Sequence, residues 1–98
     1  MTPLPTSETA IPAFVTDAQA AWETTGPGVR RKALAHGPDL MLTRVAFETG
    51  SVGARHQHPH AQLSYVESGA FEYTIGEETR TLQVGDSCYV PPLAWHGV

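Results

Sequence analysis

The sequence predicts an all-β fold, a sandwich or barrel formed by one small domain. From residue 29 onward, short apolar runs, some alternating with polar residues, each end at glycine, proline or aspartate. The runs recur at intervals of about ten residues, which is typical of β-sandwiches and barrels. No segment keeps the hydrophobic period of an α-helix over the length of a helix.

An extended N-terminal arm, residues 1–20, is expected to precede the domain, residues 21–98. The arm carries three prolines among threonine and serine residues, and this composition favours extended backbone. These prolines are Pro3, Pro5 and Pro12.

Strand and turn signals then alternate along the chain. DAQAAWE (17–23) fits either one helical turn or a short strand, and TTGPG (24–28) breaks the chain. Gly76 suits a tight hairpin turn because glycine tolerates positive φ. The predicted strands are VRRKALA (29–35), LMLTRVAFE (40–48), RHQH (55–58), AQLSYVE (61–67), AFEYTI (70–75), TRTLQV (79–84) and SCYV (87–90).

Composition and charge exclude two classes of partner. The 98 residues carry a formal net charge of −4, so the chain has no basic surface for nucleic acid or an acidic membrane. Arg30, Arg31 and Lys32 form the only basic run, and such a short run is expected on a solvated face.

Cys88 is the only cysteine, so no disulfide can form within the chain. It lies in an apolar run, which favours a buried, unreactive thiol over a nucleophile. The first residues have neither a positively charged stretch nor a long apolar one, so they predict neither a signal peptide nor a membrane span. A cytoplasmic location is therefore expected.

Three of the five histidines fall within RHQHPHAQ, residues 55–62. Because side chains alternate between faces along a strand, His56 and His58 point to one side, at a spacing that lets both bind one metal ion. His60 would share that side in a continuous strand, but Pro59 is expected to bend the chain.

Gln62 and His96 complete a possible set of four ligands with His56 and His58. Imidazole nitrogen and amide oxygen suit a divalent transition metal such as Ni, Zn, Mn, Fe or Co. Four neutral ligands leave the double charge of the ion uncompensated, which favours Lewis acidity and anionic partners; a glutamate at position 62 would weaken both. Solvent-exposed loop histidines are the alternative interpretation.

The glycines and prolines around these residues resemble the two motifs of the cupin family, of the cupin 2 type. The residues of the first motif are Gly50, His56, His58, Gln62 and Gly69, and those of the second are Gly85, Pro91, Leu93 and His96. The resemblance implies a jelly-roll barrel (a double-stranded β-helix) with a metal on His56, His58, Gln62 and His96. Glutamate usually stands at position 62 in the family, and glycine at position 93.

Residues 21–98 more closely resemble pectin degradation proteins of the KdgF type. The shared features are the WE and GPGVRR opening, HQHPHAQ, YVESG, GEETR and PPLAWHGV. This likeness implies a metal-dependent enzyme that acts on 4,5-unsaturated uronate monosaccharides, the products of pectin and alginate lyases. It would open their ring to linear 5-keto-4-deoxyuronate.

Ring opening needs a base at the anomeric hydroxyl and an acid at the enol carbon. His60 is one candidate, since it lies next to the ligands in sequence, although a surface turn also accounts for it. Tyr73 is a second candidate, and it fits a simple core position as well, as Phe71 does.

Relatives of this type continue past the last metal histidine into a further strand, with an aspartate, a phenylalanine and an arginine at the site. This sequence ends at Val98, so either it is truncated or it differs from the family there. Such an arginine would pair with the substrate carboxylate. A missing strand would leave a sheet edge open, which favours pairing with a second copy, and a homodimer is expected.

Two other functions fit the same residues. One is a different metal-cupin enzyme, an oxygenase or isomerase acting on a small organic acid, and redox-active metal with oxygen consumption would favour it. The other is a non-catalytic cupin module that binds a small molecule or a metal. The two enzyme functions imply a small anionic sugar or organic acid as the ligand.

Overall fold

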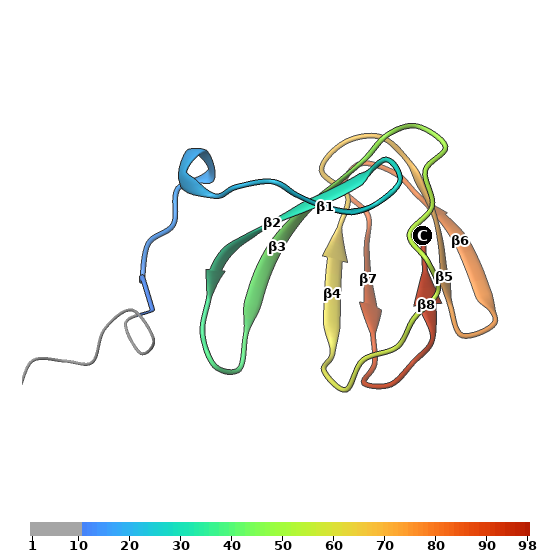
Figure 1. Cartoon of the computed structure of the whole chain (residues 1–98). Coiled ribbons are helices and arrows are strands. Elements are labelled where there is room, and N and C mark those ends of the chain that lie inside the picture. Colours follow the sequence, from blue (N-terminus) through green and yellow to red (C-terminus); the bar gives the residue numbers. More distant parts are fainter. Residues whose placement is uncertain (1–10) are drawn as a thin grey trace, which may run out of the picture. The chain divides into compact units, whose positions relative to one another are not determined.

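Eight strands and one 3-10 turn, η1 (Asp17–Gln19), make up the regular structure of residues 11–98, the part of the chain that the computed structural model describes (Figure 1). This confirms the predicted all-β class. The first ten residues of the predicted arm lie outside the described residues. The chain divides into two units, residues 1–51 and 52–98.

The first unit contains an antiparallel meander of β1 (Glu23–Gly26), β2 (Val29–His36) and β3 (Met41–Phe47), in that order. β2 and β3 are separate strands as predicted, but the break predicted over TTGPG (24–28) is wrong for its first three residues, which belong to β1. Gly28, in the turn between β1 and β2, has a φ of +70°, and a Cβ atom there would collide with the side chain of Ser51. Only glycine satisfies both conditions.

The prediction that the basic run lies on a solvated face is wrong for Lys32, a residue of β2 that is only 5% exposed. Its Nζ lies 3.1 Å from Asp17 Oδ1 and donates a hydrogen bond to the Asp17 carbonyl at 3.0 Å. The ammonium also lies 4.6 Å from the centre of the Trp22 ring. A buried charge needs such partners, and they belong to a segment that a short run of basic residues does not reveal.

The second unit contains two antiparallel sheets. One pairs β4 (Gln62–Tyr65) with β7 (Ser87–Val90), and the other has the order β6 (Glu78–Leu82), β5 (Phe71–Ile75), β8 (His96–Gly97). Gly76, at a φ of +60°, is the first of two residues between the paired Ile75 and Glu78. The hairpin turn predicted at this glycine is therefore confirmed.

The predicted strand at 55–58 is wrong for most of its length, because only His56 pairs within it. His56 and His96 exchange two backbone hydrogen bonds of 2.9 Å, and Gly53 and Val98 exchange two more. A bend follows at Pro59, which has no N–H for a ladder. The pairing sets His56 beside β8, the strand that carries His96.

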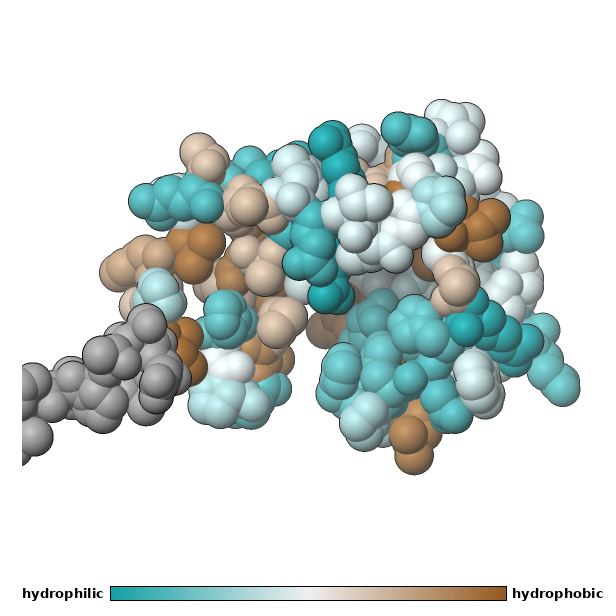
Figure 2. Space-filling view, viewed as in Figure 1, coloured by the Kyte–Doolittle hydropathy of each residue, from teal (hydrophilic) through white to brown (hydrophobic). Residues whose placement is uncertain are grey.

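The buried residues of the second unit are Val66, Tyr73, Val90 and His96. A histidine that is 1% exposed is unusual, since imidazole is polar on both nitrogens. The opposite side of the β4–β7 ladder is apolar and exposed, because Leu63 and Tyr89 are register partners at 80% and 55% exposure. Hydrophobic side chains also reach the surface in the space-filling view (Figure 2).

Candidate metal centre

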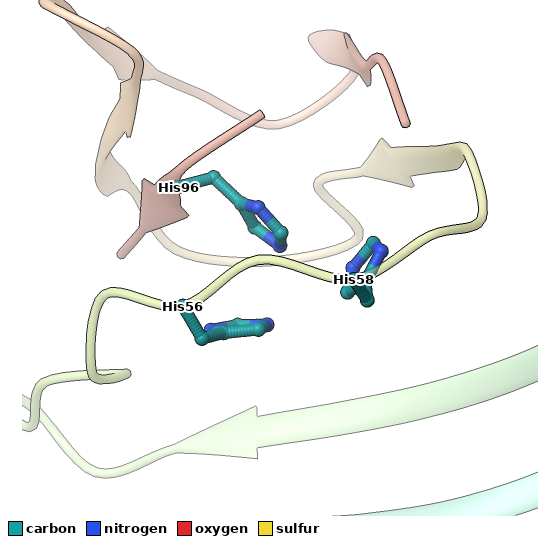
Figure 3. Close-up of side chains that lie close together, drawn as sticks. All are labelled: His56, His58 and His96. Carbon is teal, nitrogen blue, oxygen red and sulfur yellow. The ribbon is translucent and has the colours of Figure 1, made fainter. Parts of the chain in front are cut away.

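Three imidazoles from two separate stretches of sequence meet in the second unit. His56 and His58 come from the stretch before β4, and His96 comes from β8 (Figure 3). One nitrogen from each ring lies within 4.8 Å of the others, so these three histidines can hold one metal ion. The ring centres of His56 and His58 lie 4.2 and 4.7 Å from that of His96.

A backbone contact engages Nδ1 in each of the three rings, which leaves Nε2 as the possible ligand atom. The Nδ1 atoms lie 2.8–2.9 Å from backbone carbonyl oxygens, those of Ala54, His60 and Ala94. A carbonyl can only accept, so each Nδ1 carries the hydrogen and each neutral ring has its lone pair on Nε2. Backbone partners of this kind are the usual means of orienting metal-binding histidines.

His96 gives a further indication of a cation. Its Nε2 is buried and has no hydrogen-bond partner among the described residues. Burial lowers the pKa of His96 below its ordinary value of 6.5, against the opposing effect of the Ala94 carbonyl, so the ring is neutral at pH 7. A buried acceptor without a partner costs about 1–3 kcal/mol, and a bound cation removes that cost.

Gln62 presents a fourth donor atom to the cluster. Its Oε1 lies 3.0 Å from Nε2 of His58. When the His58 ring is neutral with its hydrogen on Nδ1, this contact brings two acceptors together with no hydrogen between them. A cation shared by both atoms satisfies their lone pairs, so the amide oxygen fits a metal site as well as the imidazoles do.

The two candidate proton-transfer residues lie in different surroundings. The exposed His60 stacks parallel on His58, with ring centres 3.9 Å apart. Tyr73 is 9% exposed, and its hydroxyl accepts a hydrogen bond of 2.8 Å from Nε2 of Gln62. His60 thus borders the cluster from outside, whereas Tyr73 contacts a possible ligand from inside.

Ser64 belongs to the same group, although sequence reasoning did not identify it. Its Oγ accepts a hydrogen bond of 2.9 Å from Nε2 of Gln62. Its position two residues after Gln62 on one strand was the available signal, since alternate residues share a face.

The Cys88 thiol lies beside the hydroxyls of Ser64 and Tyr73. Burial raises the pKa of Cys88 and that of Tyr73 above their ordinary values, so both groups are protonated near pH 7. The groups around the amide nitrogen of Gln62 are therefore uncharged. A protonated thiol also agrees with the prediction that Cys88 is unreactive.

Comparison with known proteins gives the family. A family model described as a cupin domain matches residues 43–98, more than half of the chain. The chain belongs to the cupin family. The predicted fold class is confirmed, and the matched range includes the three histidines of the cluster.

Individual relatives resemble most of this cupin. It is 37% identical over 86 residues to the pectin degradation protein KdgF of Dickeya dadantii. This alignment covers 87% of the chain and 78% of the Dickeya protein. The structure of KdgF from a Halomonas species is similar at a TM-score of 0.81 and 40% sequence identity. The match covers 88% of this chain and 79% of the Halomonas chain. The structure of an RmlC-like cupin from Shewanella frigidimarina is similar at a TM-score of 0.84 and 35% sequence identity. The match covers 88% of this chain and 78% of the Shewanella chain.

Within residues 11–98, no helix has the length and apolar character needed to cross a membrane.

Proposed function

We propose that this cupin is a metal-dependent enzyme that opens the ring of 4,5-unsaturated uronate monosaccharides to linear 5-keto-4-deoxyuronate. The observation that carries the proposal is the donor set, in which three imidazoles with free Nε2 lone pairs meet one amide oxygen. All four donors are neutral. Similarity to two KdgF proteins, one of them named for pectin degradation, supports the choice of substrate.

The proposed ligands of the metal are His56, His58, Gln62 and His96. Nitrogen and neutral oxygen donors suit a divalent transition ion such as Ni, Zn, Mn, Fe or Co. When bound, the ion would supply Lewis acidity and a positive charge that the ligands do not compensate. That charge suits a sugar that carries a carboxylate.

His60 is the proposed proton-transfer residue, because its imidazole is exposed and lies against a ligand of the site. The anomeric hydroxyl loses its proton as the bond between C1 and the ring oxygen breaks, which leaves an aldehyde at C1 and an enolate on C5. C4 then gains a proton and C5 becomes a ketone. One proton is lost and one is gained, so the reaction is an isomerisation that a single acid–base group can serve.

The proposal is tested by following the ultraviolet absorbance of freshly prepared 4,5-unsaturated galacturonate. We expect decay faster than in buffer, and loss of this excess rate with chelator or with His56→Ala. His36→Ala is the matched control, since His36 is an exposed histidine of the first unit and should keep the full rate.

Decay no faster than in buffer, from protein shown to carry metal, would exclude uronate linearisation for this chain. Oxygen consumption during turnover of a small organic acid would point instead to an oxygenase. Metal binding without turnover of any acid would leave a binding module.

We also propose a homodimer, with the exposed face of the β4–β7 ladder as the contact. Leu63, Tyr65 and Tyr89 on this face are 80, 67 and 55% exposed, and apolar side chains gathered on one face are typical of an interface. Sedimentation velocity should give twice the mass of the chain for the wild type. Leu63→Lys should shift it to the monomer, and an unchanged dimer would place the contact elsewhere.

A cytoplasmic location is proposed as well. The single cysteine suits a reducing compartment, where disulfides do not persist. Fractionation of the native host tests this, and recovery in an extracytoplasmic fraction would contradict it.

A further inference from the structure

Two hydroxyl groups hold the amide of Gln62 on the side away from the histidines. Its Nε2 donates to Ser64 Oγ at 2.9 Å and to Tyr73 Oη at 2.8 Å. The two hydroxyl oxygens lie 3.2 Å apart, so one of them donates to the other. The three groups form a closed triangle of hydrogen bonds.

Because one hydroxyl donates to the other, the triangle favours the nitrogen of the amide over its oxygen as the third member. An amide nitrogen has two hydrogens, and the hydroxyls of Ser64 and Tyr73 accept one each. The oxygen is then the end that faces His58, at 3.0 Å. An amide rotated by half a turn would direct an N–H group at Nε2 of His58, which would remove both atoms from a metal.

We propose that Ser64 and Tyr73 are positioning residues that hold Gln62 as the fourth metal ligand. The inference rests on the proposed metal site, and it deepens that proposal by naming the groups that make a glutamine dependable as a ligand. Neither residue touches the metal or the substrate in this assignment.

The placement of the two residues in the fold suits this role. Ser64 lies on β4 with Gln62, whereas Tyr73 lies on β5 in the other sheet of the unit. β5 also pairs with β8, and there Ile75 is the register partner of His96. The Tyr73 hydroxyl therefore links the sheet that carries His96 to the strand that carries Gln62.

Removal of the hydroxyls should release the amide. In Tyr73→Phe the ring still fills its buried position, but one amide hydrogen loses its acceptor. In the double variant Ser64→Ala/Tyr73→Phe, both acceptors are gone and the oxygen is no longer held toward His58. Loss of groups that orient a ligand typically weakens metal binding by about 10–100-fold.

Cobalt binding provides a direct test that needs no substrate. The metal-free full chain is titrated with Co²⁺, and the visible absorption reports both affinity and coordination. We expect the double variant to bind Co²⁺ about 10–100-fold more weakly than the wild type, with the spectrum of Gln62→Ala. Adding Gln62→Ala to the double variant should cause little further loss, since the three residues act as one unit.

Two control variants separate positioning from packing. Val66→Ala removes buried side-chain volume from the same unit but no hydrogen-bond partner of Gln62, Ser64 or Tyr73, so it should keep the affinity and spectrum of the wild type. Ser64→Thr in the Tyr73→Phe background should retain more affinity than Ser64→Ala, because it restores a hydroxyl. Circular dichroism and unfolding of each metal-free variant check that the fold is intact.

Three results would overturn the inference. In the first, the double variant keeps the Co²⁺ affinity and spectrum of the wild type. In the second, the triple variant loses as much affinity as Gln62→Ala and the double variant lose together. In the third, the wild type takes up no Co²⁺. The uronate assay is read separately. If the cobalt cycle behaves as expected while uronates are not turned over, the positioning role stands and only the proposed substrate fails.

Discussion

Leu93 adopts a backbone conformation that its residue type disfavours. Its φ of 64° is the only positive value of a non-glycine residue within residues 11–98. The left-handed conformation costs an L-residue about 1–2 kcal/mol, and a side chain that is 61% exposed recovers little of this by burial. The Leu93 N–H donates to the carbonyl of His58 at 2.8 Å, so the strained turn helps to fix a residue of the metal cluster.

Leu93→Gly should stabilise the protein or leave its stability unchanged. Glycine removes the strain, but it also loses about 0.5–1 kcal/mol through the greater freedom of the unfolded chain. The expected gain therefore lies between zero and about 1.5 kcal/mol, measured by urea unfolding of the metal-free protein. Leu40→Gly is the control, since Leu40 is 79% exposed without a positive φ, and it should be destabilised. Equal losses in both variants would show that position 93 is not strained.

Gln62→Glu should separate metal binding from turnover. A carboxylate binds a divalent ion more tightly than an amide does, but its charge reduces the positive charge offered to an anionic sugar. Metal should therefore be retained, while kcat/KM for the unsaturated uronate falls by roughly tenfold or more. Gln57→Glu adds the same charge one residue away from His56 and His58 on an exposed side chain, and it should have a smaller effect. Equal losses in the two variants would indicate a general electrostatic effect.

At the scale of elements, one aspartate joins η1 to two strands of the first unit. Asp17 Oδ1 lies 3.1 Å from Nζ of Lys32 on β2 and 2.9 Å from a guanidinium nitrogen of Arg44 on β3. Hydrogen bonds from Lys32 and Arg44 lower the pKa of Asp17 below its ordinary value of 3.8. The charged carboxylate is therefore favoured in the folded state, and the buried ammonium depends on it.

Asp17→Asn should lower the melting temperature at neutral pH and have progressively less effect in acid. A carboxyl with a lowered pKa contributes its stability above its unfolded pKa and loses it as pH falls through 3.8 and below. The melting curves of wild type and variant should thus converge at low pH. Asp39→Asn, in the turn between β2 and β3, is the control, because Asp39 makes no ion pair within the part of the chain described. A constant difference between wild type and Asp17→Asn at all pH values would contradict the role of the charge.

Sequence patterns predicted those elements whose signal is local. Alternation along AFEYTI and glycine at position 76 were sufficient for β5 and its hairpin. The bridge between His56 and His96 was not predicted, since such a short pairing depends on a partner forty residues away. The burial of Lys32 was missed for the same reason, because its partners Asp17 and Trp22 come from another segment.

The candidate site shows the same limit. Motif spacing selected His56, His58, Gln62 and His96, and the structure brings these residues together. It did not predict the carbonyls that fix the three tautomers, nor the hydroxyls that hold Gln62, because hydrogen-bond partners across strands depend on the folded geometry. Tyr73 was singled out as a catalytic or core residue, and its contact with Gln62 appears only in the structure.

At the scale of the whole molecule, the metal centre belongs to one unit. The four proposed ligands all lie in residues 52–98, and the first unit supplies none of them. His96 on β8 and His56 opposite it join two ends of this unit, so a bound ion would link segments that otherwise share few backbone pairs. Metal binding should therefore stabilise the folded state of the second unit.

Removal of metal should accordingly lower the melting temperature by a large amount. An ion present at 1,000 times its dissociation constant stabilises the folded state by about 4 kcal/mol, and each kcal/mol corresponds to about 4–8 °C for a chain of this size. Chelator should thus lower the melting temperature of metal-loaded protein by roughly 15 °C or more, and fresh metal should restore it. The difference should shrink in acid, because protons then compete with the ion for Nε2 of His96, whose pKa burial holds below its ordinary value. His96→Ala should show almost no response to chelator, whereas His36→Ala, an exposed histidine of the first unit, should respond as the wild type does. A full response in His96→Ala would place the ion elsewhere in the molecule. Nε2 of His96 is the proposed ligand atom that is buried and has no hydrogen-bond partner among residues 11–98.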